Sequence, residues 1–195
     1  MNSFRAKKIL ALAAFCFAIG ATGAPKDHSR DETLVLYGQR RVILTVPAGF
    51  TYSSEKNDRG LITAKLTDSK ETIILQISFL PDDKGEFATS RGRKEFMAQS
   101  FQPYVSGSVE KAMQFEELEP RFGSGTYCVF TDANLVEKKS FPAGEFLNST
   151  TGVKTWRGFA AVFTLLSNNT TSEHYHTALR LLRESLNEPP LTPLR

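Results

Sequence analysis

Two histidines, His174 and His176, form the one close pair of imidazoles in the chain, and imidazole nitrogens are common ligands of zinc. On a strand, side chains two positions apart share one face, whereas on a helix they point about 200° away from each other. The leucine spacing around the pair predicts a helix, so the two side chains do not converge on one ion. We therefore expect no metal and no cofactor, and we interpret both histidines as polar residues on a helix surface.

Cys128 carries a thiol, which is a strong nucleophile once it has lost its proton. A thiol pKa falls into the useful range only beside a basic neighbour, and Cys128 lies instead in the apolar run Tyr127–Phe130. Such a run predicts a strand with a buried, structural thiol.

The sequence contains no G-x-S-x-G elbow, no H-E-x-x-H helix and no P-loop. Gly123-Ser124-Gly125 has the glycine content of a phosphate-binding loop, but a β-run rather than a helix follows it from Thr126. We expect these glycines to form the tight turn of a β-hairpin. The sequence therefore predicts a protein that is not an enzyme.

Three glutamates, Glu116, Glu117 and Glu119, form an acidic cluster in a predicted β-run. Paired carboxylates catalyse proton transfer only inside a pocket that shifts their pKa values, and the surrounding sequence does not indicate one. We expect a solvated face of the sheet.

A basic cluster, Arg91, Arg93 and Lys94, opens the helix that we predict from Ser90 to about Gln102. Cations at a helix N-terminus oppose the helix dipole, at a cost of roughly a few tenths of a kcal/mol. A locally unfavourable choice can mark a functional surface, so these three residues are our candidate partner-binding patch, for an acidic partner or a lipid head group. The alternative is a solvent-facing helix start with incidental charge.

Residues 1–24 have the three-part layout of a secretory signal peptide: basic residues, then the apolar stretch Ile9–Ile19, then small residues. The apolar stretch is shorter than the roughly 20 residues of a membrane span. We expect cleavage at Gly23 or nearby, no transmembrane anchor after it, and a location in the periplasm or outside the cell. An uncleaved N-terminal anchor is the alternative.

Removal of the signal changes what the charge implies. The chain has 24 Lys and Arg against 21 Asp and Glu, and three of the basic residues lie in the signal, which leaves 21 of each sign. No positive field remains to attract nucleic acid. Cys16 leaves with the signal, so Cys128 has no partner for an internal disulfide. Stability must therefore come from a hydrophobic core, for which one domain of this length suffices.

The rest of the chain is predicted to form one domain, residues 33–188, between a disordered segment at 25–32 and a C-terminal tail at 189–195. Apolar alternation and turn residues predict strands at 33–37, 41–46, 61–66, 72–80, 114–122, 126–135, 145–151 and 156–167. The last strand is apolar on both faces, which places it in the centre of the sheet.

A second helix is predicted from Thr170, where Glu173 completes a capping box. Its apolar stripe, which we expect to pack on the sheet, consists of Tyr175, Leu179, Leu182 and Leu186. Short turns between neighbouring strands favour an antiparallel sheet. The predicted fold class is α+β: a mostly antiparallel sheet with helices packed on both faces, which is an α/β/α sandwich.

This order of elements resembles the α/β/α sandwich of the group that includes PsbP, the Mog proteins and DcrB. The similar stretches are Val46–Phe50, Ile77–Pro81, the Gly123–Leu135 hairpin arm, and Gly158–Leu166 with the helix from Thr170 to Leu186. Members of the group have unrelated binding tasks, so the resemblance implies a non-enzymatic binding domain and no particular site residue.

The sequence thus predicts an exported, non-enzymatic domain that binds another envelope component, an unknown envelope protein. One alternative is a small enzyme whose polar residues converge only in three dimensions, in a pocket that gathers His174 or His176 with acids from distant strands. A lipid or small-ligand carrier is another, which fits the 15 phenylalanines but requires an interior cavity.

Overall fold

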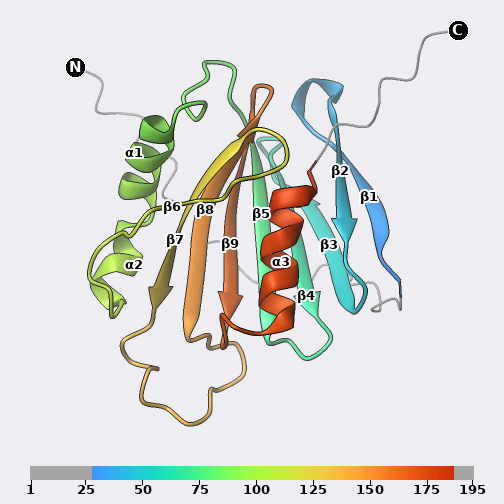
Figure 1. The fold of residues 1–195 in the computed structure, drawn as a ribbon. Helices are drawn as coiled ribbons and strands as arrows, with labels where there is room; N and C mark the ends of the chain where they lie inside the picture. Colours follow the sequence, from blue (N-terminus) through green and yellow to red (C-terminus); the bar gives the residue numbers. More distant parts are fainter. Residues whose placement is uncertain (1–27, 187–195) are drawn as a thin grey trace, which may run out of the picture.

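The computed structural model describes residues 28–186, which form a seven-stranded antiparallel sheet, a separate two-stranded sheet and three α-helices (Figure 1). The predicted signal peptide at 1–24 and the predicted tail at 189–195 lie outside the described residues. The large sheet has the order β3-β4-β5-β9-β8-β7-β6. Its strands are β3 Phe50–Lys56, β4 Ile62–Asp68, β5 Ile73–Pro81, β6 Glu116–Glu117, β7 Ser124–Thr131, β8 Asn148–Trp156 and β9 Phe159–Ser167.

The first two strands, β1 Arg30–Val35 and β2 Arg41–Val46, form an antiparallel hairpin of their own around a 3-10 turn. β1 begins slightly before the predicted domain start at residue 33. The chain that follows the last helix runs along β2, because Leu186 N donates to Ile43 O at 3.1 Å and Thr45 N donates to Ser185 Oγ at 2.8 Å. The hairpin is thereby held against the rest of the fold.

The larger hydrophobic core lies between the sheet, the β1–β2 hairpin and α3, Glu173–Glu184. Alternate residues of β5 and β9 face it, and α3 contacts both strands; Figure 1 shows α3 in front of β5, running roughly along the strands. The predicted stripe is confirmed: its four members, Tyr175, Leu179, Leu182 and Leu186, are all buried in this core.

A smaller core lies beneath α1, Ser90–Ser100, where Met97 and Phe101 pack with Cys128 of β7 and Val153 of β8. α2, Gln102–Gly107, continues along the same end of the sheet. Farther across this face, the residues of β3, β4 and β5 are partly exposed; examples are Thr51, Thr63, Lys65, Ile74 and Gln76. The helices therefore leave much of this face open.

The expected α/β/α sandwich is wrong. The protein is mostly β, with 41% strand and 20% helix, and three helices do not form helical layers on both faces of a seven-stranded sheet. The two apolar faces of the last strand led to that expectation. Alternation along a strand indicates that a face is apolar, but not which element covers that face. On one face of β9 the core is closed partly by the β1–β2 hairpin instead of a helix. On the other face, Val162 and Leu166 stay partly exposed.

Several strand predictions are confirmed. The sheet is antiparallel, β1 pairs with β2, β4 pairs with β5, and β9 occupies the middle of the strand order. One strand was missed altogether: β3 contains Thr51, Ser53 and Ser54 in place of alternating apolar residues. It pairs along its whole length with β4, which supplies the partner that its own composition does not indicate.

The boundary predicted between the strands at 145–151 and 156–167 is wrong, and so is the turn predicted at 123–125. β8 continues through Trp156 and reverses at Arg157-Gly158, whose φ angles of 43° and 80° suit a tight hairpin. The glycines at 123–125 are not a tight turn, because β7 starts at Ser124 and β6 is only two residues long. Pro120, which cannot donate to a strand partner, follows Glu119 with its positive φ of 51°, and the chain leaves the sheet there.

The predicted helices form, and a side chain caps the start of each. The Thr89 side chain accepts from Gly92 N and caps α1, and Ser172 accepts from Tyr175 N and caps α3. The capping box at Thr170 and Glu173 is therefore wrong, since Asn169 builds a turn before the helix. Within residues 28–186, no helix is long and apolar enough to cross a membrane.

Candidate functional site

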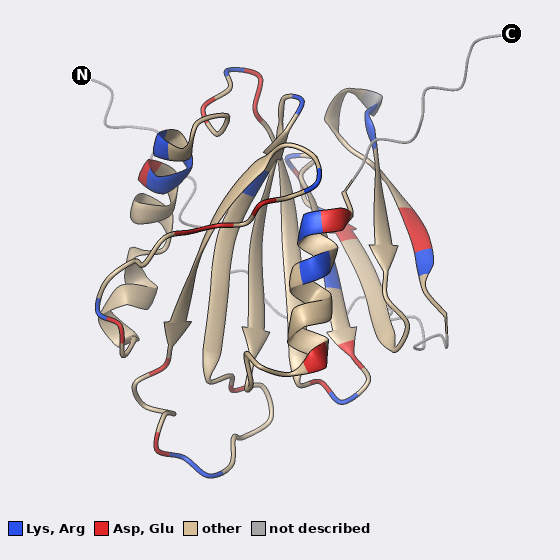
Figure 2. Cartoon of the chain, viewed as in Figure 1, with Lys and Arg blue, Asp and Glu red and all other residues tan. Residues whose placement is uncertain are grey.

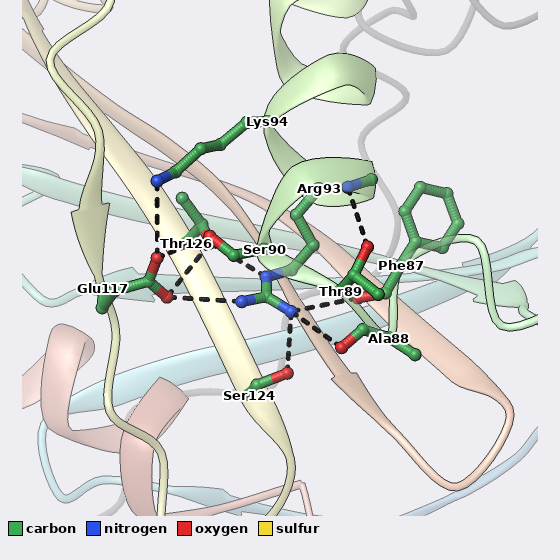
Figure 3. A network of polar contacts seen from close by, with 10 residues as sticks. Phe87, Ala88, Thr89, Ser90, Arg93, Lys94, Glu117, Ser124 and Thr126 are labelled. Carbon is green, nitrogen blue, oxygen red and sulfur yellow. Dashed lines mark hydrogen bonds and ion pairs between the residues drawn. The ribbon is translucent and has the colours of Figure 1, made fainter.

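Arg93 belongs to the candidate basic patch, and its side chain is buried between α1 and β7 (Figure 3). Its guanidinium donates to Thr126 Oγ1 at 2.9 Å, to Ser124 Oγ at 2.8 Å and to the carbonyl of Phe87 at 3.1 Å. It also donates to the carbonyl of Ala88 at 3.4 Å and forms an ion pair with Glu117 at 3.3 Å. Arg93 therefore acts as an internal connection between the helix and the sheet.

The structure does not bring Arg91, Arg93 and Lys94 to one surface. Arg91 is exposed and paired with Glu95 one helical turn on, and the Lys94 ammonium lies 3.8 Å from Glu117. Figure 2 shows basic and acidic segments close together on the first turns of α1. The partner-binding patch remains a prediction, to which Arg91 and Lys94 contribute the accessible charge.

The glutamates of the acidic cluster have different surroundings. Burial by itself raises the pKa of Glu117, but hydrogen bonds from Ser90 and Thr126 and the charge of Arg93 outweigh it and lower that pKa. Glu116 accepts a hydrogen bond from the Tyr127 hydroxyl at 2.5 Å. Glu117, whose lowered pKa favours its charged form, is therefore a weak general base.

Cys128 is fully buried on β7, which confirms the structural thiol. Desolvation, together with the negative charge of Glu116, raises its pKa to about 12. At neutral pH the thiolate is therefore scarce, and Cys128 is unsuited to nucleophilic attack.

His174 and His176 lie on α3, as predicted, and they make different contacts. His174 Nδ1 lies 3.0 Å from Asp68 Oδ2 at the end of β4, whereas the ring of His176 packs edge-on against Tyr175. Asp68 also accepts from Thr72 N at 2.6 Å and from Ile73 N at 2.9 Å. Burial raises the pKa of Asp68, and these hydrogen bonds outweigh that effect and lower it.

The Asp68–His174 contact brings an acid from a distant strand to a histidine, as the enzyme alternative requires. Its sequence separation of 106 residues gave no local signal of the pairing. The Asp68 carboxylate also accepts from backbone groups of the β4–β5 turn, so its contact with His174 anchors the start of α3 to that turn.

Among the described residues, no group of three or more His, Cys, Asp or Glu side chains could hold a metal ion.

Lys154 is a buried cation that the sequence pattern did not single out. Its ammonium donates to Ser185 O, at the C-terminal cap of α3, at 2.7 Å and lies 5.8 Å from the Trp156 ring. Desolvation lowers its pKa to about 8. A cation at a helix C-terminus is favourable for the helix dipole, which gives Lys154 a structural role.

A pocket of about 580 Å³ lies where α2, the ends of β7, β8 and β9, and the loop at 132–147 meet. We call it the end pocket. Its apolar lining consists of Pro103, Tyr104, Phe130, Leu135, Phe146, Leu147 and Leu166. Its polar lining includes Ser149, Asp132, Asn134, Lys138 and Glu145. An apolar wall with a small number of polar groups is typical of ligand-binding pockets.

Backbone hydrogen bonds fix the walls of the end pocket. Val109 N donates to Thr131 O at 2.8 Å and Ala133 N donates to Gly107 O at 3.0 Å, which ties the end of α2 to the end of β7. Asp132 N donates to Leu147 O at 2.8 Å, which closes the base of the 132–147 loop. The pocket is therefore built into the fold, although its lining residues are spread over 64 positions of the sequence, from Pro103 to Leu166.

Ser149 is the polar group in the end pocket that lacks an internal contact. Its Oγ is buried and has no hydrogen-bond partner among the described residues. Buried hydroxyls in proteins are nearly always hydrogen-bonded, so this one is an exception, although its oxygen is itself closed off from the pocket. Sequence reasoning missed this site because serine in a strand carries no signal of its own.

Comparison of the chain with family models, with curated proteins and with solved structures gave no match. The resemblance to the group of PsbP, Mog and DcrB therefore remains a prediction, and the site has to be interpreted from its own geometry.

Proposed function

We propose that the chain is an exported, non-enzymatic domain that binds another component of the cell envelope in the end pocket. The observation that carries this proposal is a pocket of about 580 Å³ whose wall is mostly apolar and carries a few polar side chains. Ligand sites in proteins typically have this size and composition. The predicted signal peptide supports a location in the periplasm or outside the cell.

Catalysis has less support from the same residues. The Cys128 thiol has a raised pKa, Glu117 is held in its charged form, and Asp68 is occupied by a turn. None of these three side chains lines the end pocket. The carboxylates that do line the pocket already have partners, since Asp132 accepts from Asn134 N and Glu145 pairs with Lys138, so binding is the better interpretation.

Photo-crosslinking in cells that make the full-length protein tests the proposal. A benzophenone amino acid replaces one of three exposed residues: Lys138 at the rim of the end pocket, Arg91 on α1, or Asp58 in the β3–β4 turn. We expect an adduct from position 138, identified by mass, and none from position 58. Adducts from position 91 alone would transfer the site to the basic patch and contradict the proposal.

Fractionation of the same cells tests the predicted location. We expect the protein in the envelope or medium, shortened at its N-terminus by about the length of the predicted leader. Full-length protein confined to the cytoplasm would overturn the export part of the proposal.

A further inference from the structure

We draw no further inference here: the strongest candidate, the partly exposed face of the sheet over β3, β4 and β5, carries no proposal because nothing in the structure shows what covers it.

Discussion

The guanidinium of Arg93 makes its contacts with groups from three parts of the chain: the Phe87 carbonyl before α1, the side chains of Ser124 and Thr126 on β7, and Glu117 on β6 (Figure 3). Its side chain is 3% exposed, whereas that of Arg91, two positions earlier, is 88% exposed. Arg91 and Arg93 are equivalent in sequence and opposite in role, because a helix turns them toward different surroundings.

Arg93→Ala should therefore destabilise the protein strongly, by about 2–4 kcal/mol, because it leaves the buried Phe87 carbonyl and the Thr126 hydroxyl without this donor and removes one of the partners of Glu117. Arg91→Ala removes an exposed pair and should change the free energy of unfolding by less than about 0.5 kcal/mol. Urea unfolding of both variants measures the difference. Equal effects would show that Arg93 does not connect α1 to the sheet.

Lys154 should give the protein an alkaline gain in stability. Its pKa is lowered from 10.5 to about 8 in the fold, so the unfolded chain holds the proton more tightly between these values. The free energy of unfolding should then rise with pH from about 8 to 10.5, by at most roughly 3 kcal/mol from this group.

Lys154→Met removes the ionisable group and fills similar space, so its stability curve should lack this part of the rise. Chemical unfolding of wild type and variant at a series of pH values measures the two slopes. If the free energy of unfolding changed with pH in the same way for wild type and Lys154→Met between pH 7 and 10, the lowered pKa of Lys154 would be contradicted.

At the scale of elements, Gly152 lets β8 pass close to the ring of Phe163 on β9. A methyl group at this position would collide with that ring and with the carbonyl of Thr126 on β7. Gly152→Ala should therefore cost about 2–4 kcal/mol of stability, because overpacking in the middle of a sheet displaces both neighbours. Gly107→Ala is the matched control, since no atom lies within 4 Å of its added methyl group, and it should stay within about 1 kcal/mol of the wild type. Thermal unfolding of the two variants compares them, and a stable Gly152→Ala protein would show that the strands are spaced more loosely.

Local pattern predicted the elements whose side chains alternate or recur regularly. The stripe of α3 and the central position of β9 followed from spacing alone, since both are buried by their neighbours. The missed strand β3 is polar and is recognised only by its pairing with β4. In β8, threonines and Gly152 interrupt the apolar alternation, so the sequence did not predict the full length of the strand. Whether β3 and the end of β8 form strands depends on their pairing with other strands, and the sequence of one segment does not contain that information.

The candidate site was less predictable than the fold for the same reason. The end pocket joins α2 to the ends of three strands, and Ser149 in its lining is an ordinary strand residue until Leu166 and Tyr104 are placed beside it. The charges of Arg91, Arg93 and Lys94 were visible in the sequence, but burial removed Arg93 from the surface.

At the scale of the whole molecule, the sheet is covered unevenly. One face is closed by α3 and the β1–β2 hairpin, and the other is covered by α1 and α2 mainly over β7 and β8 (Figure 1). The end pocket lies at the border between the covered and the open part of that second face. We propose that the protein binds its partner at this border, where the helices leave the face of the sheet uncovered.

Hydrogen–deuterium exchange of the mature chain, with and without a detergent-free envelope extract, tests that claim most directly. We expect slower exchange at residues 103–108 and 131–149 when the extract is present, and unchanged exchange at 50–60 in the β3–β4 hairpin. Gly107→Trp should lose the effect, because Gly107 lines the pocket and has open space where a side chain would start. Slower exchange confined to the start of α1 or to β3, with residues 131–149 unaffected, would contradict the end pocket as the binding site.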